Sequence, residues 1–166
     1  IKRLVYSPNT LPRQYETGEL SSEEFYIKIK EMCNLDVSLE QFAIDYSDIF
    51  TTIPETVELI KKLKGRYKLA LLSNTGPWHY EREKREIEEL SLLDTITVSY
   101  EVGVMKPDEK IFRDALRKLE LKPQECIFID DVEEYVKAAL RLGINGIQYV
   151  SPEKLLSDLE KLGVDF

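Results

Sequence analysis

The sequence has little that could form a disulfide framework, a redox centre or a membrane span. Its 166 residues contain two cysteines, Cys33 and Cys126, and no metal-ligand or redox spacing involves either. Both thiols are expected to pack as small apolar side chains rather than to form a disulfide. No apolar run is long enough to cross a bilayer, and the amino terminus shows no charged and then apolar leader. We therefore expect a cytoplasmic protein.

Positive charge is also scarce relative to negative charge. The chain has 31 acidic residues against 23 lysines and arginines, which gives a net charge of -8. This sign opposes binding to nucleic acid or to an anionic membrane through a broad electrostatic field, although a local phosphate pocket is compatible with it. A hydrophobic content of 43% can supply one sizeable core, and the chain is too short for two ordinary domains.

The first third of the chain has a helical pattern. Ser21 with Glu24 and Ser38 with Gln41 are capping-box signals, each followed by apolar residues at helical spacing. The pattern predicts a pair of helices between residues 21 and 50. Ordinary packing between the two helices explains the apolar seam. The functional interpretation is that the helix pair forms a lid over a site. The residues of the predicted seam are Phe25, Ile29, Met32, Cys33, Leu39, Phe42, Tyr46, Ile49 and Phe50.

The rest of the chain alternates between short apolar runs and amphipathic helices. Strands are predicted at residues 67–72, 95–100, 126–129 and 146–150, with helices beginning at Pro54, Pro107, Val132 and Pro152 and a charged helix after the first strand. Such alternation is typical of the α/β class. It predicts a Rossmann-like, doubly wound parallel sheet that is covered by helices on both faces.

Five polar or charged residues lie where three of these strands end. Ser73 and Asn74 end one strand, Asp130 and Asp131 end another, and Lys106 follows a third. Each has an ordinary explanation alone, as a turn residue, a surface charge or a helix cap. Because the carboxyl ends of parallel strands share one edge, the five are expected to converge. Adjacent carboxylates suit Mg²⁺, and a lysine beside a hydroxyl and an amide suits phosphoryl oxygens, so the pattern predicts a phosphoryl-transfer site.

Three segments resemble, in order and spacing, the second, third and fourth motifs of the haloacid dehalogenase superfamily. They are LALLSNT (Leu69–Thr75), VMKPDEKIF (Val104–Phe112) and IFIDDVEEYVKAALRLGI (Ile127–Ile144). The segment YETGELSSEEF (Tyr15–Phe25) is similar to the one that leads through the small helical cap in one subgroup. That subgroup contains small sugar-phosphate phosphatases, 2-haloacid dehalogenases and the amino-terminal domain of some epoxide hydrolases. The resemblance covers essentially the whole chain.

The resemblance implies a role for each of the five residues. Ser73 would bind phosphate through its hydroxyl, with Asn74 as an adjacent polar contact, and Lys106 would steady nucleophile and phosphate. Asp131 would bind Mg²⁺ directly, with Asp130 beside it in the metal shell. Dehalogenases of this superfamily need no metal, so the aspartate pair favours a Mg²⁺-dependent phosphatase over the alternative of a 2-haloacid dehalogenase. The expected partner is a small phosphorylated metabolite, and a sugar phosphate is the resemblance-based expectation.

The superfamily's first motif is missing from the sequence. That motif is a strand ending in Asp-x-Asp, whose first aspartate attacks phosphorus and forms an aspartyl phosphate. Here the first aspartate is Asp36, which lies in a helical region. The favoured explanation is that the strand lies upstream of the sequence. Residues 1–52 would then be the remnant of a helical cap and residues 53–166 an α/β core without its usual first strand, a central one between the strands that end at Ser73 and Asp130.

The other explanation is a complete chain that has lost its catalytic residues. Ile1 to Tyr6 would supply the central strand, and Ser7 and Asn9 would occupy the places of the two aspartates. Neither side chain could form an aspartyl phosphate. The protein would then be a non-catalytic binding or scaffold domain. This explanation is disfavoured because it leaves few residues for a cap before Tyr15.

Three further residues have weaker expectations attached. His79 and Trp78 follow the first predicted strand closely and could touch a substrate, but a loop that packs one aromatic side chain explains them equally well. Tyr135 stands where relatives often carry asparagine, a departure that we expect to affect helix packing rather than chemistry.

Overall fold

The computed structural model describes residues 10–166. The proposed strand at Ile1 to Tyr6 lies outside the described residues. Over the part that is described, no helix is long and apolar enough to cross a membrane.

The amino-terminal part consists of α2 (Leu11–Glu16), α3 (Ser22–Cys33) and α4 (Leu39–Ser47). The predicted capping box at Ser21 is confirmed, whereas Ser38 forms only the N-cap bond of the predicted box. The Ser21 hydroxyl accepts a hydrogen bond from the Glu24 backbone N–H while the Glu24 carboxylate accepts one from the Ser21 N–H, and the Ser38 hydroxyl accepts one from the Gln41 N–H. These bonds satisfy N–H groups that the first turn of a helix leaves unpaired, and so fix where α3 and α4 begin.

The predicted apolar seam between these helices is only partly correct. Phe25 is fully buried, but Met32 is 68% exposed and Cys33 is exposed, so the expectation that Cys33 packs in the interior is wrong. Met32 and Cys33 belong to the last turn of α3, while the exposed Ile49 and Phe50 lie beyond the end of α4. The apolar periodicity therefore extends past the region where the helices pack.

An aromatic cluster forms the packed part of the seam. Tyr15 stacks on Phe25 with 4.5 Å between ring centroids and 9° between planes, and Phe42 stacks on Tyr46 at 5.5 Å. The Trp78 ring lies 5.5 Å from Tyr15 and 5.7 Å from Phe42. Trp78 belongs to α6 (Pro77–Glu86), so the cluster joins the amino-terminal helices to the rest of the molecule.

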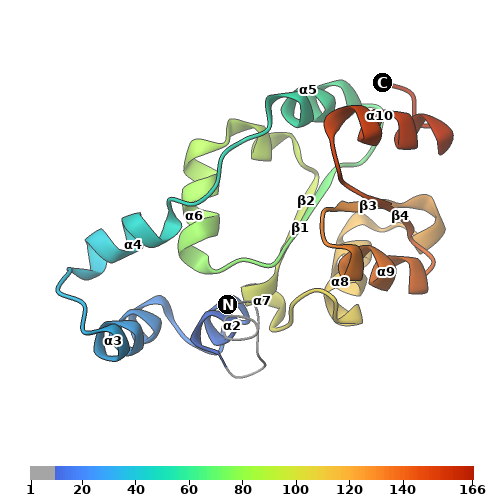
Figure 1. The fold of residues 1–166 in the computed structure, drawn as a ribbon. Coiled ribbons are helices and arrows are strands. Elements are labelled where there is room, and N and C mark those ends of the chain that lie inside the picture. Colours follow the sequence, from blue (N-terminus) through green and yellow to red (C-terminus); the bar gives the residue numbers. More distant parts are fainter. Residues whose placement is uncertain (1–9) are drawn as a thin grey trace.

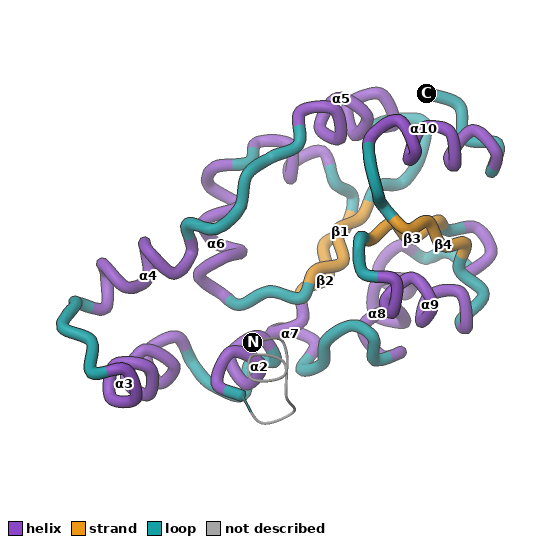
Figure 2. The backbone as a smooth tube through the Cα atoms, viewed as in Figure 1, coloured by secondary structure: helices purple, strands orange, loops and turns teal. Residues whose placement is uncertain are grey.

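The strands form two parallel pairs. β1 (Ala70–Ser73) pairs with β2 (Thr95–Val98), and β3 (Ile127–Asp130) pairs with β4 (Asn145–Gln148). Figure 2 shows the two pairs side by side at the centre of the α/β part. The α/β class and the parallel strands are as expected. Within residues 10–166, however, the pairs are not hydrogen-bonded to each other, so they form two separate sheets instead of one continuous sheet.

Helices cover both faces of the strand pairs, as Figure 1 shows. On one face α5 (Pro54–Leu63) and α10 (Pro152–Lys161) pack in a cluster with Ile147 of β4. On the other face α8 (Glu109–Leu119) and α9 (Glu133–Arg141) contribute buried residues to a second cluster, against which side chains of β1 and β3 pack. The shorter elements are η1 (Glu88–Leu92), α7 (Ser99–Val102) and η2 (Pro123–Glu125).

An apolar groove lies between the free edges of β1 and β3. It has a volume of about 80 Å³ and is lined by side chains of both strands and of α8. Ile129 in β3 remains 38% exposed, although a residue of a central strand in an α/β fold is ordinarily covered. The two helical layers, rather than a ladder of backbone hydrogen bonds, therefore join the two halves of the α/β part. The lining residues are Ala70, Leu72, Phe112, Ala115, Leu116, Leu119, Cys126, Ile127, Phe128 and Ile144.

Candidate functional site

The five residues singled out in the sequence lie at the carboxyl ends of the strands or in the loops beside them. Ser73 is the last residue of β1 and Asn74 follows it, and Asp130 is the last residue of β3 with Asp131 after it. Lys106 lies in the loop between α7 and α8. Helix α8 was expected to begin at Pro107, but it begins at Glu109. The Asp108 carboxylate accepts a hydrogen bond from the Lys110 N–H and so caps the amino end of α8.

Two reciprocal hydrogen bonds join Asn74 to Lys106. The backbone N–H of Lys106 donates to Asn74 Oδ1 at 2.7 Å, and Asn74 Nδ2 donates to the Lys106 carbonyl at 3.1 Å. One side-chain amide thus satisfies both backbone groups of a residue far away in the sequence. Asn74 therefore fixes the position of the loop that carries the lysine.

The Lys106 ammonium bridges the two strand pairs. Its Nζ donates to the Leu72 carbonyl in β1 at 3.0 Å and to Asp130 Oδ2 in β3 at 2.6 Å. The residue is only 8% exposed, and Nζ lies 5.6 Å from the centre of the Phe128 ring and 5.2 Å from that of Tyr135. A cation at this depth needs a partner of opposite charge, which Asp130 supplies. The pair spans the opening between β1 and β3.

The two aspartates have different surroundings. Asp130 is largely buried, and its second oxygen, Oδ1, accepts a hydrogen bond from the Val132 N–H at 2.9 Å. Asp131 is exposed, and within the described part of the chain its carboxylate forms no ion pair. Its backbone carbonyl accepts a hydrogen bond from Gln148 Nε2, which ties the loop after β3 to β4. The site therefore offers one neutralised carboxylate and one open carboxylate.

Comparison with known proteins shows which family the chain belongs to. Residues 19–143 match the haloacid dehalogenase-like hydrolase family. The chain belongs to this family. A haloacid dehalogenase family enzyme from Bacteroides thetaiotaomicron, solved in complex with magnesium and inorganic phosphate, superposes with a TM-score of 0.80 at 27% identity. The alignment covers 87% of this chain and 77% of that enzyme.

The chain aligns with most of one sequence relative and with a small part of another. The D-ribitol-5-phosphate phosphatase of Bacteroides thetaiotaomicron is 24% identical over 152 residues, which are 86% of this chain and 73% of that protein. Acyl-CoA dehydrogenase family member 10 of Mus musculus is 27% identical over 153 residues, which are 87% of this chain but only 14% of that protein.

Two residues that contact the candidate site in this member of the haloacid dehalogenase-like hydrolase family were not predicted from the sequence. Tyr135 was expected to affect helix packing alone, but its hydroxyl accepts a hydrogen bond from Asn74 Nδ2 at 3.4 Å and its ring lies beside the Lys106 ammonium. Ser99, fully buried at the start of α7, accepts a hydrogen bond from the Thr75 N–H at 2.9 Å and donates one to the Thr75 carbonyl at 3.1 Å. The serine lies within a predicted strand, and nothing in its sequence neighbourhood indicated this contact.

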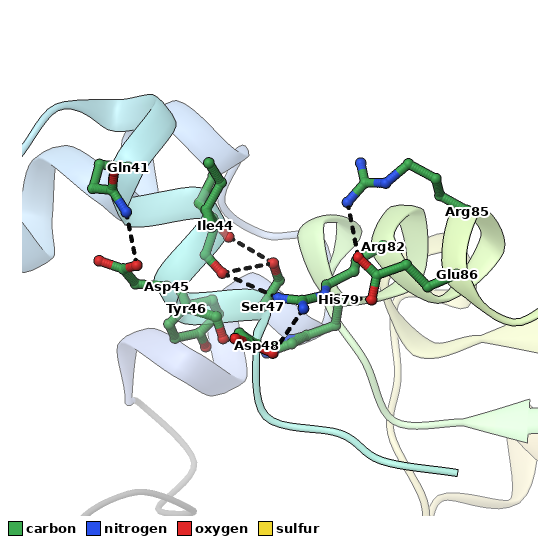
Figure 3. Close-up of polar contacts among 11 residues, drawn as sticks. Gln41, Ile44, Asp45, Tyr46, Ser47, Asp48, His79, Arg82, Arg85 and Glu86 are labelled. Atoms are coloured by element: carbon green, nitrogen blue, oxygen red, sulfur yellow. Dashed lines mark hydrogen bonds and ion pairs between the residues drawn. The ribbon is translucent and has the colours of Figure 1, made fainter.

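His79 lies apart from the five candidate residues. Its ring is buried, with Nε2 2.9 Å from the Tyr46 carbonyl at the end of α4 (Figure 3). Burial lowers the pKa of the imidazole, and the hydrogen bond with Tyr46 opposes this only in part. A neutral ring that binds a neighbouring helix explains His79 as part of the interior. Trp78 likewise belongs to the aromatic cluster.

Proposed function

We propose that this chain carries the phosphate- and cation-binding part of a site that hydrolyses small phosphomonoesters. One observation supports this most directly. The buried ammonium of Lys106 lies between β1 and β3, where it binds the Leu72 carbonyl and pairs with Asp130, and the Lys106 backbone is bound by Asn74. Phosphoryl transfer depends mainly on positioning and on neutralising negative charge, and this group of residues can do both. The similarity to a D-ribitol-5-phosphate phosphatase supports a sugar or polyol phosphate as the substrate class.

In this proposal each side chain acts on the phosphoryl oxygens in a different way. The Ser73 hydroxyl, which forms no hydrogen bond within residues 10–166, donates to one oxygen. Lys106 supplies a positive charge that Asp130 holds in place. Asn74 keeps the lysine loop beside β1 through its two backbone hydrogen bonds. The low exposure of Lys106 strengthens its interaction with an anion, because water screens a buried charge less.

The donor set also fits Mg²⁺. The exposed carboxylate of Asp131 is open to a cation, and Asp130 stands beside it. No cluster of three acidic, histidine or cysteine ligands occurs among the residues that the structure describes. Mg²⁺ usually binds one or two carboxylates and completes its shell with water and phosphate oxygens, so Asp131 and Asp130 would be its protein ligands. When bound, the ion would neutralise phosphate charge. The related enzyme that carries magnesium and inorganic phosphate supports the assignment.

The covalent step requires a carboxylate nucleophile, and no aspartate precedes Asp36 in this sequence. We propose that hydrolysis takes place in a protein in which an Asp-x-Asp strand accompanies this chain. The first aspartate would attack phosphorus and form an aspartyl phosphate, while the second would protonate the departing alkoxide. Water activated by that second carboxylate would then hydrolyse the aspartyl phosphate and release inorganic phosphate.

Calorimetric titration of the chain with inorganic phosphate, with and without Mg²⁺, tests the binding part of this proposal. We expect phosphate to bind more tightly with Mg²⁺ present, and Asp131→Asn to remove most of this enhancement. Lys106→Met should weaken phosphate binding about tenfold or more, because it removes a charge-assisted hydrogen bond. Asp36→Asn and Lys137→Met are matched controls, since both residues are exposed and lie outside the site. Equal binding by the site variants and the controls would contradict the assignment.

A further inference from the structure

Tyr15 reaches from α2 into the loop that follows β1. The residue is fully buried, and its hydroxyl accepts a hydrogen bond from the backbone N–H of Trp78 at 3.0 Å. The same hydroxyl lies 3.0 Å from the Ser22 hydroxyl at the start of α3. One phenol group thus contacts both the amino-terminal helices and the beginning of α6.

At the start of α6 the Tyr15 hydroxyl takes the place of a capping side chain. Gly76 occupies the N-cap position and has no side chain to accept a hydrogen bond, while Pro77 at the first helical position has no N–H. The N–H of Trp78 is therefore the first that α6 must satisfy, and Tyr15 accepts it. A Cβ atom on residue 76 would lie 2.5 Å from Tyr15 Cε1, so glycine is required for the ring to approach.

This contact is next to the proposed phosphate-binding residues. Gly76 follows Ser73, Asn74 and Thr75 directly in the chain. Thr75 is held on the other side by its two hydrogen bonds to the buried Ser99 hydroxyl. The end of the loop is therefore fixed between Ser99 and Tyr15, and a shift of the Tyr15 hydroxyl would move the backbone on which Ser73 lies.

A second set of contacts fixes α6 further along its length. His79 Nε2 lies 2.9 Å from the Tyr46 carbonyl, and Arg82 pairs with Asp48 at 2.7 Å and donates to the Ile44 carbonyl at 3.4 Å (Figure 3). These contacts hold the carboxyl end of α4 against the first and second turns of α6. They are formed by side chains of α6, whereas the Tyr15 hydroxyl binds the backbone N–H of Trp78, next to the loop.

We propose that Tyr15 is a positioning residue, which sets the Ser73–Thr75 loop for phosphate binding according to the position of α3. This inference rests on the proposed function. The stacked Phe25 ring and the Ser22 hydroxyl transmit the position of α3 to Tyr15, and the hydrogen bond to the Trp78 N–H transmits it to the loop.

The test compares the variants Tyr15→Phe and Tyr26→Phe of the 166-residue chain. Tyr26 is a matched control, because its hydroxyl also forms a hydrogen bond with the backbone, donating to the Val37 carbonyl at 2.7 Å, but within the amino-terminal helical part. Inorganic phosphate is titrated in the presence of Mg²⁺, and the fluorescence of Trp78, the single tryptophan, reports binding. We expect Tyr15→Phe to weaken phosphate binding about threefold to tenfold, and Tyr26→Phe to leave it unchanged at a similar loss of thermal stability.

Backbone amide NMR provides a readout that does not depend on phosphate. In Tyr15→Phe the amide signals of Trp78 and of Ser73 to Thr75 should shift, whereas Tyr26→Phe should leave them in place. Unmoved loop signals, or equal phosphate affinity in Tyr15→Phe and the unmodified chain, would overturn the role of Tyr15. Shifted loop signals in a chain that binds no phosphate would leave the positioning contact standing and reject the phosphate site instead.

Discussion

At the scale of single residues, Glu16 is a carboxylate that the fold holds in an unfavourable environment. Burial raises the pKa of its carboxyl group from the ordinary value of 4.5 to about 7, and the charge of Arg13 opposes this only in part. Because the folded protein binds the proton more tightly than the unfolded chain, this group favours folding fully below pH 4.5. The contribution is lost as the pH rises toward and through 7.

Replacing Glu16 by glutamine should therefore stabilise the protein in a pH-dependent way. The amide resembles the protonated carboxyl, so Glu16→Gln should change the free energy of unfolding little at pH 4.5 and raise it by about 2–3 kcal/mol at pH 8. Urea denaturation at a series of pH values measures this difference. Glu23→Gln, at an exposed position of α3, is the control and should show no such trend. A constant difference between Glu16→Gln and the unmodified chain would show that the carboxyl is not desolvated.

Among the elements, α8 is followed by a C-cap residue whose backbone conformation is unfavourable. Glu120 at the C-cap has a φ of 56°, in the left-handed region, where it lets the backbone N–H reach the carbonyls of Leu116 and Arg117. L-residues other than glycine, asparagine and aspartate adopt this region at a cost of about 1–2 kcal/mol. α3 ends in the same way at Asn34, with a φ of 50°.

We expect Glu120→Gly to raise the free energy of unfolding by about 0.5–1 kcal/mol, because relief of the strained backbone exceeds the added entropy of the unfolded chain. Asn34→Gly is the matched control. It should have a smaller or opposite effect, since asparagine tolerates the left-handed region. Chemical denaturation of both variants compares them directly, and a larger gain at residue 34 than at residue 120 would contradict this account.

The same elements show what a sequence can and cannot predict. The starts of α3, α5 and α10 were predicted because a capping serine or a proline at the first turn acts locally. The predicted strand at residues 95–100 ends early, because Ser99 begins α7 and turns toward Thr75. Such a contact joins segments far apart in the chain, and no local pattern encodes it.

The positions of the candidate site residues were predictable to a similar degree. The placement of Ser73, Asn74, Lys106, Asp130 and Asp131 follows from the rule that ligands bind at the carboxyl ends of parallel strands. The pairing of the lysine with the first aspartate rather than the second could not be read from the sequence, because the two carboxylates are adjacent and differ only in burial. The contact between Tyr135 and Asn74 was missed because it joins residues far apart in the chain.

At the scale of the whole molecule, two strand pairs share their helices but no backbone ladder. The apolar clusters on the two faces and the bridge from Lys106 to Asp130 hold the pairs side by side. Between them lies the apolar groove, which residues of both β1 and β3 line, and within residues 10–166 each of these strands is paired on one side only. Unpaired groups at a strand edge are ordinarily satisfied by another strand or by water. Backbone amides at the groove should thus be the least protected from exchange with water in the α/β part.

Hydrogen exchange should reveal this asymmetry within single strands. In β1 and β3, amides that point toward the paired strand should be protected as well as those in the middle of α9, since both open only when the packed core opens. Amides of the same strands that point into the groove should exchange about 100-fold faster, because water reaches them without loss of the core. Residue-resolved exchange measured by NMR separates the two sets. Equal protection along β1 would mean that another part of the protein covers the groove in solution, and the two pairs would then belong to one continuous sheet.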